Sequence, residues 1–239
     1  MMKRYALALA LSSPLGATAA PDALLMIAPL NQTMPLASFD AGKLDGGIIK
    51  DLGDAIARRA GRRASYLSVA GDRVASVLRH GQADGICYVR PFWIDGDFHW
   101  SKPLIPDAEL IASKLDAPVV RSLLDLRDRP VGTVTGYRYP RVEQVVGLRF
   151  QRADSATMEE NLRAMMQGGA RHTIIGRSTL MYQLKVNKNL RLRPDLVFAS
   201  FTAQCAFSKR SGLDFAAVDR AINSLVGDGS VDAILARYK

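Results

Sequence analysis

Residues 46–89 read GGIIKDLGDAIARRAGRRASYLSVAGDRVASVLRHGQADGICYV, and this stretch decides the fold. Apolar residues recur at helical spacing over 48–60, which predicts a helix with one buried face. A short apolar run at 66–69 predicts a strand, and Asp72 is placed to cap a second helix. The apolar run at 85–89 predicts a further strand. The stretch therefore alternates helix, strand, helix and strand.

The segments on either side extend this alternation. An apolar run at 24–27 predicts a strand before the first helix, and the tail at 218–238 predicts two more helices. Strands that alternate with helices imply a mainly parallel sheet covered by helices, which is the α/β class. The same alternation returns downstream, with predicted strands at 131–135, 148–150 and 172–175, and predicted helices that begin near Pro140, after the Thr157/Glu160 capping box and near Ser178.

Two extended segments, at about 107–113 and 196–208, connect the first group of elements to the second. We therefore expect two α/β lobes, with the second inserted into the first. The first lobe comprises residues 20–112 and 200–239, and the second comprises residues 113–199. Ligands of such sheets bind at the carboxyl ends of the strands, so the expected site is a cleft between the lobes.

The first residues have the pattern of a secretory signal peptide. Basic residues at 3–4 precede an apolar run at 5–11, and small residues follow at 17–20. This order predicts cleavage after Ala19, so that residues 1–19 are removed on export. The alternative is a membrane anchor, but the run is shorter than the roughly 20 apolar residues that a spanning helix needs. We expect an exported, soluble protein.

Composition and charge limit the kinds of partner that we expect for the chain. The 239 residues carry a formal net charge of +9, and loss of the two basic residues of the signal would leave +7. Hydrophobic residues make up 48% of the chain, enough for one large domain or two small ones. The basic residues form no run of five or more and no aromatic stacking motif accompanies them, so nucleic acid is not an expected partner.

Cysteines and histidines offer few ligands for a metal. Cys87 and Cys205 each lie in an apolar, strand-like run, where a disulfide and two free buried thiols are both open interpretations. His80, His99 and His172 are far apart, and neither cysteine has a neighbour at the spacing of zinc ligands. We expect no metal site.

Five stretches carry short patterns in a fixed order. They are 46–57, like G-F-D-x-D-L-x-x-x-I-A; 72–86, like W-x-x-x-x-x-x-L-x-x-G-x-x-D-x-I; 98–104, like F-x-F-S-x-P-Y; 124–136, like L-x-D-L-x-G-x-x-V-G-x-x-x-G; and 218–238, like A-I-x-x-L-x-x-D-G-x-x-x-x-I-x-x-x-Y. Together they resemble bacterial periplasmic solute-binding proteins of family 3, which include polar amino-acid-binding components of ABC transporters.

The resemblance implies a type II periplasmic-binding-protein-like fold. In that fold, each of two lobes is a mostly parallel sheet flanked by helices, and two hinge strands join the lobes. It implies a periplasmic monomer without a cofactor, whose lobes close on a small solute and which docks on a membrane permease. Closure requires that the solute favours the closed state over the open one.

The expected ligand set departs from the family pattern. Members hold an α-carboxylate with arginine and an α-ammonium with an acidic residue, but an arginine, Arg177, stands where that acid is expected. The candidate ligand-binding residues are Asn31, Thr33, Tyr88, Arg90, Trp93, Tyr137, Arg138 and Arg177. Guanidinium groups bind carboxylate and phosphate in a bidentate way, so we expect an anionic or carboxylate-bearing solute with an apolar or aromatic part, such as an amino-acid-like one. Each arginine can equally be solvated and each aromatic ring can equally belong to a core.

Two other functions stay open. One is an enzyme on the same fold, because some relatives of the family are dehydratases, and the other is a ligand-sensing protein that works without a transporter. The sequence has no G-x-S-x-G turn, P-loop or H-E-x-x-H motif. No second carboxylate is recognisably paired with Glu109, Glu143, Glu159 or Glu160. We therefore predict a binding protein with no catalytic residues.

Overall fold

A computed structural model describes residues 23–239, so the predicted signal peptide lies outside the described residues. The strands are β1 (Ala23–Pro29), β2 (Ser38–Asp40), β3 (Lys43–Gly46), β4 (Arg63–Val69), β5 (Gly85–Val89), β6 (Phe98–Trp100), β7 (Ile105–Lys114), β8 (Pro130–Val134), β9 (Gln151–Ser155), β10 (His172–Gly176) and β11 (Leu192–Ser208). The helices are α1 (Ile48–Arg59), α2 (Val74–Arg79), α3 (Pro140–Val146), α4 (Met158–Met166), α5 (Arg177–Val186), α6 (Phe215–Gly227) and α7 (Ser230–Ala236).

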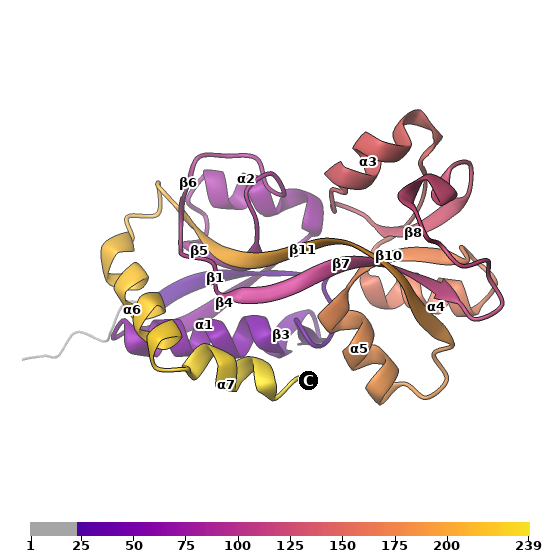
Figure 1. The fold of residues 1–239 in the computed structure, drawn as a ribbon. Helices are drawn as coiled ribbons and strands as arrows, with labels where there is room; N and C mark the ends of the chain where they lie inside the picture. Colours follow the sequence, from indigo (N-terminus) through magenta and orange to yellow (C-terminus); the bar gives the residue numbers. More distant parts are fainter. Residues whose placement is uncertain (1–22) are drawn as a thin grey trace, which may run out of the picture.

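One twisted sheet runs through the molecule in the order β4-β1-β5-β11-β7-β10-β8-β9, with β6 also paired to β11 (Figure 1). The β1–β4, β1–β5, β10–β8 and β8–β9 pairs are parallel. In the middle, β7 and the long β11 pair antiparallel with each other. Strand β11 also pairs with β5 near its end, so it passes from one half of the sheet to the other.

These pairings confirm the α/β prediction and the two lobes. We call the part built on β1, β4, β5 and β6, with α1, α2, α6 and α7, the first lobe. The second lobe is built on β8, β9 and β10, with α3, α4 and α5. Strands β7 and β11 cross between them (Figure 1).

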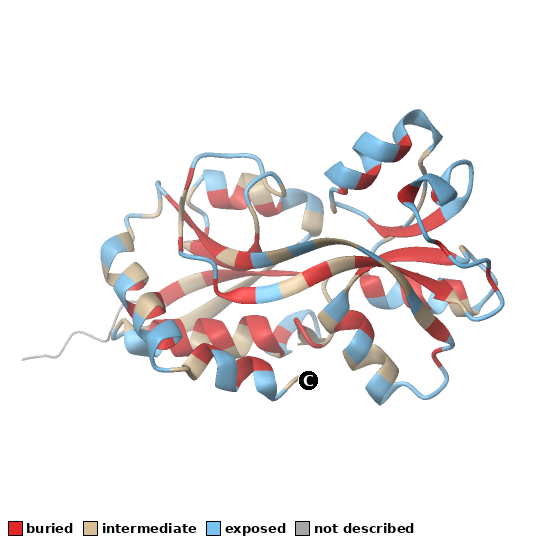
Figure 2. Ribbon diagram, in the orientation of Figure 1, coloured by how far each residue is buried: buried red, intermediate tan, exposed pale blue. Residues whose placement is uncertain are grey.

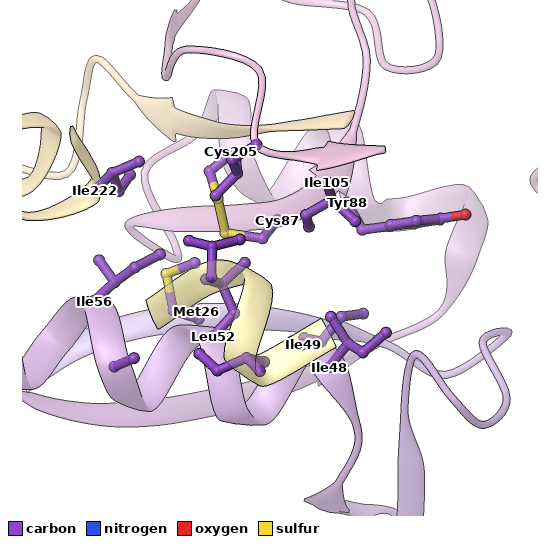
Figure 3. Close-up of a cluster of buried hydrophobic side chains, with 14 of the residues drawn as sticks. Met26, Ile48, Ile49, Leu52, Ile56, Cys87, Tyr88, Ile105, Cys205 and Ile222 are labelled. Carbon is purple, nitrogen blue, oxygen red and sulfur yellow. A yellow bond between two sulfur atoms is a disulfide. The ribbon is translucent and has the colours of Figure 1, made fainter. Parts of the chain in front are cut away.

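Each lobe buries apolar side chains on both faces of its sheet. Figure 2 shows the buried residues along the strands of both lobes and along the helices beside them. In the first lobe, Leu52 and Ile56 of α1 and Ile222 of α6 pack in one cluster with residues of β1, β5 and β11 (Figure 3). The opposite face is covered by α2, whose Val77 and Leu78 are buried. Burial of one apolar face per helix is what the helical spacing in the sequence predicts.

Cys87 of β5 and Cys205 of β11 form a disulfide and are directly paired in the sheet (Figure 3). This settles the alternative that the sequence left open. The bond joins residues 118 apart in sequence and fixes the end of β11 to the first lobe.

Two local predictions are wrong. Residues 147–149 form a 3-10 helix rather than a strand, and β9 begins at Gln151. Gly147, with a φ of 65°, turns the chain there. Asp72 lies within a 3-10 turn, and the residue before α2 is Arg73, which makes no side-chain cap. By contrast, Thr157 accepts a hydrogen bond from the Glu160 N–H and caps α4 as predicted.

Within residues 23–239, no helix has both the length and the apolar character needed to cross a membrane.

Candidate solute-binding pocket between the lobes

A cavity of about 120 Å³ lies where the two lobes meet. The loop after β1 and the end of β5 line it from the first lobe, and the loop after β8 and the start of α5 line it from the second. Strands β7 and β11 contribute Glu109 and Phe201. A buried water needs roughly 10–15 Å³ of such space, so the cavity has room for a small solute.

The structure brings six of the eight predicted site residues to this pocket. They are Asn31, Thr33, Tyr88, Trp93, Tyr137 and Arg138. Arg90 and Arg177 are not part of the lining. Arg177 is the first residue of α5 and is exposed, so its guanidinium group is in contact with water.

Arg90 lies behind an aromatic wall of the pocket. Its guanidinium carbon is 5.4 Å from the ring centroid of Trp93 and 4.9 Å from that of Phe201. The Trp93 and Phe201 rings meet edge to face at 5.1 Å, and Tyr88 lies 6.3 Å from Phe201. These three rings give the pocket a continuous apolar surface with one positive charge held against its outer side by cation–π attraction.

Arg138 lines the pocket but already has an anionic partner. Its Nη1 donates to Asp95 Oδ1 at 2.8 Å, and its Nη2 donates to Asp95 Oδ2. Because Asp95 belongs to the first lobe and Arg138 to the second, this bidentate ion pair joins the lobes. The guanidinium group that the sequence predicts for a solute carboxylate is thus paired with a carboxylate of the same chain.

Tyr88 has its ring in the wall and its hydroxyl in a polar cluster. Figure 3 shows the ring extending away from the buried apolar cluster, with the hydroxyl at its far end. The hydroxyl donates to Asp107 Oδ2 at 2.5 Å, and burial raises the pKa of Tyr88 well above its ordinary value. The residue has a φ of 63°, a backbone conformation that is strained for an aromatic residue and is found most often at functional sites.

Asp107 holds the start of α5 beside the crossing strand. Its Oδ1 accepts from the Ala108 and Ser178 N–H groups, at 2.7 and 3.1 Å. Its Oδ2 accepts from the hydroxyls of Tyr88 and Ser178. With four donors around it, this carboxylate is fully satisfied and connects β5, β7 and α5.

Glu109 is a charged pocket residue that the sequence interpretation did not place in the site. It lies on β7 and is half-buried, and it forms no side-chain hydrogen bond or ion pair with any residue in 23–239. Burial raises its pKa to about 7, while the Arg90 charge opposes that rise and Asp107 adds to it. One signal could have revealed it. Asp107 and Glu109 alternate with the buried Ala108 and Leu110, so both point to one face of an otherwise apolar crossing strand.

Asn31 connects the lobes from the other side of the pocket. Its Nδ2 donates to the Thr135 carbonyl at 3.1 Å, and its backbone carbonyl accepts from the Met158 N–H at 3.2 Å. The residue is only 4% exposed, and its Oδ1 has no hydrogen-bond partner in the part of the chain that the structure describes.

Further hydrogen bonds join the two lobes directly. Gln183 Nε2 of the second lobe donates to the Met34 carbonyl of the first at 2.8 Å. Lys185 Nζ donates to the Lys239 carbonyl at 2.6 Å. No group of three or more His, Cys, Asp or Glu residues within 23–239 is arranged to hold a metal ion.

Two lobes joined by crossing strands, with a pocket between them, define the periplasmic-binding-protein-like class of fold. Solved structures share it over most of the chain. An ancestral arginine-binding protein bound to arginine has a TM-score of 0.77 at 19% identity, covering 92% of this chain and 99% of its own. The arginine-, lysine-, histidine-binding protein ArtJ from Geobacillus stearothermophilus has a TM-score of 0.76 at 21% identity, covering 90% and 94%.

A histidine kinase sensor domain with similarity to periplasmic binding proteins has a TM-score of 0.75 at 20% identity, covering 91% of this chain and 96% of its own. At these identities the likeness establishes the fold. No family model and no curated protein sequence matches the chain.

Proposed function

We propose that this protein is a periplasmic solute-binding protein that captures a small solute by closing its lobes. The observation that carries the proposal is the pocket, because residues of both lobes and of the crossing strands line it. A solute held there contacts both lobes at once. Such contacts exist only in the closed arrangement, so they supply the difference in affinity that drives closure.

The proposed solute carries a carboxylate and an apolar or aromatic part, as a small amino-acid-like metabolite does. The rings of Tyr88, Trp93 and Phe201 offer the apolar surface. Arg138 is the guanidinium group in the lining, and a solute carboxylate would replace Asp95 as its partner. Arg90 adds a second positive charge behind the wall. Arg177 lies outside the lining and has no role in the proposed site.

Delivery of the solute to a membrane permease is the proposed role of the closed form. The alternative of ligand sensing without a permease has one specific support, which is the fold shared with a histidine kinase sensor domain. A gene for a permease beside the gene for this protein would favour transport, and a gene for a membrane sensor there would favour sensing.

The test is isothermal calorimetry on exported, signal-cleaved protein against the twenty L-amino acids and their deaminated carboxylic acids. We expect one-site binding of a carboxylate-bearing solute with an apolar or aromatic part. Trp93→Ala should weaken it, because the wall of the pocket is lost. Phe92→Ala is the matched control, since Phe92 is adjacent in sequence, 83% exposed and outside the lining.

Three results would overturn parts of this proposal. Binding of nothing in the panel contradicts the function itself. Lysine or arginine as the tightest ligand contradicts the proposed solute class. Appearance of a new product by mass spectrometry, after incubation with a solute that binds, shows an enzyme on this fold instead.

A further inference from the structure

The pocket contains a carboxyl group that the fold itself does not use. Glu109 and Arg138 are the acidic and basic side chains in the lining formed by residues 23–239, and Arg138 is bound by Asp95. Glu109 has no such partner. The Arg90 guanidinium acts on it electrostatically but forms no ion pair with it.

Asp107, on the same strand as Glu109, is a carboxylate with a clear structural role. It lies two residues earlier and accepts hydrogen bonds from Tyr88, Ala108 and Ser178. Glu109 accepts none from residues 23–239. A half-buried carboxylate without a partner is destabilising, because its lost hydration is not replaced. The hydrogen bonds that connect β5, β7 and α5 therefore account for the burial of Asp107. They do not account for the burial of Glu109.

A second acceptor in the pocket is also unused. The Asn31 Nδ2 donates a hydrogen bond to the Thr135 carbonyl, which fixes the orientation of the side-chain amide. The Oδ1 of the same amide has no such bond with residues 23–239. That oxygen is fully buried and without a donor in the described chain. Native structures leave few buried polar atoms unsatisfied, and Asn31 belongs to the pocket lining, so its Oδ1 indicates a donor that the described residues do not supply. Both unused groups accept hydrogen bonds, and a protonated amine is a donor that satisfies both.

We propose that Glu109 and Asn31 form an acceptor pair for a protonated amine on the solute, so that the pocket selects amine-bearing solutes and holds them more tightly as pH rises. This inference rests on the proposed function, since it names the feature by which the same pocket chooses its solute. It also explains how an amine can be bound although Arg177 occupies the position where the resemblance places an acidic partner.

The pH dependence follows from the surroundings of Glu109. Burial raises the pKa of Glu109 to about 7, which already includes the lowering effect of Arg90 and the smaller raising effect of Asp107. The charged or titratable groups around Glu109 are Tyr139, Asp107, Arg90 and the pocket-lining Arg138. Binding an amine requires the carboxylate form, which is about a tenth of the population at pH 6 and about nine tenths at pH 8. Affinity should therefore rise about tenfold across this interval, with release of a proton.

The experiment compares solutes that differ by the amine alone. Calorimetry measures L-leucine against 4-methylpentanoate, L-phenylalanine against 3-phenylpropionate, and the corresponding pair for every other amino acid that the panel shows to bind. We expect the amine-bearing member of each bound pair to bind at least about tenfold more tightly, as a hydrogen bond to a charged group predicts. Glu109→Gln should remove both this preference and the rise with pH. Glu159→Gln, at an exposed carboxylate of α4 outside the lining, is the matched control.

The outcomes separate the two proposals. If no amino acid and no deaminated acid binds, both the solute-binding function and the amine site are overturned. Binding of the deaminated acids as tightly as the amino acids overturns the amine site and leaves the solute-binding function standing. An affinity of the unaltered protein that falls as pH rises shows that protonated Glu109 is the binding form, which also overturns the amine site. These last two measurements need no variant, so they hold even if Glu109→Gln fails to fold.

Discussion

Arg138 and Asp95 form a bidentate ion pair that joins the second lobe to the first beside the pocket, with Nη1 donating to Oδ1 at 2.8 Å. Their side chains are 50% and 61% exposed, so water and salt reach both. The same guanidinium lines the cavity. The Arg138 guanidinium group therefore both joins the lobes and lines the pocket between them.

Removing either charge of this pair should shift the empty protein toward the open arrangement. An exposed ion pair contributes about 0.2–1 kcal/mol, so Asp95→Asn and Arg138→Gln should each lower the closed-to-open ratio by at most about fivefold. Small-angle scattering, or a fluorescence distance between labels on the two lobes, measures this ratio. The double variant should resemble either single one, because both remove the same interaction. Additive effects would contradict a direct coupling between the two residues.

Glu109 should make the folded protein less stable at alkaline pH. Its pKa of about 7 exceeds the ordinary 4.5, so the folded protein binds more protons than the unfolded chain between these values. The unfolding free energy therefore falls as pH rises through this interval. Glu109→Gln should be more stable than the parent at about pH 8, by up to about 3 kcal/mol.

Urea denaturation at about pH 5 and about pH 8 measures this difference. The advantage of Glu109→Gln should grow with pH and be small at the acidic end. An advantage of equal size at both values would show that the substitution acts through packing rather than through titration.

His172 should have the opposite effect on stability. Burial, then the charge of Arg129, lowers the pKa of His172 below 6.5, with Arg171 and Arg193 adding to the effect and Asp195 opposing it. The Ser113 hydroxyl donates to Asp195 at 2.6 Å, so it accepts the 2.8 Å bond from His172 Nδ1. The histidine is therefore neutral in the fold.

Protonation of His172 is more favourable in the unfolded chain, so the unfolding free energy should fall as pH falls through about 6.5. Thermal melting between about pH 7.5 and about pH 5.5, in a Glu109→Gln background that removes the opposing titration, isolates this effect. His172→Gln should flatten the profile. An unchanged profile would assign the acid sensitivity to another group.

The disulfide should stabilise the first lobe. It closes a loop of 118 residues, and a native disulfide that closes a long loop typically contributes about 2–4 kcal/mol. The Cys87→Ala, Cys205→Ala double variant should unfold at a correspondingly lower urea concentration. Reductant should lower the midpoint of the parent protein and leave that of the double variant unchanged. An equal response of both proteins would contradict a role of the bond in stability.

The order of the elements could be predicted from the sequence, because each element depends on neighbours within a few residues. The helical spacing at 48–60, the capping box at Thr157 and the apolar run at 85–89 each produced the expected element. The two errors have the same local origin. Leu148 is apolar and is therefore expected in a strand, but the turn at Gly147 leaves it fully exposed in a 3-10 helix.

The pocket could be predicted only in part, because its chemistry depends on contacts between distant residues. Tyr88 lies near the end of β5, Trp93 follows β5 and Tyr137 follows β8, so their common location at the carboxyl ends of strands could be inferred. Arg138 pairs with Asp95, which is 43 residues away in the sequence, so the sequence does not reveal that this arginine already has an anionic partner. Glu109 looks like a lone carboxylate in the sequence, and its burial emerges only when β7 crosses between the lobes.

Strand β11 is 17 residues long and is covalently fixed to β5 at Cys205. Its last residues must therefore rotate as one body with the first lobe. Any swing of the second lobe has to be absorbed by backbone torsions before Gln204. The pairing of β11 with β7 is irregular within that portion, between Pro194 and Leu196 and between Val197 and Ala199. The crosslink, which lies outside the pocket lining, therefore confines any such swing to the part of β11 before Gln204.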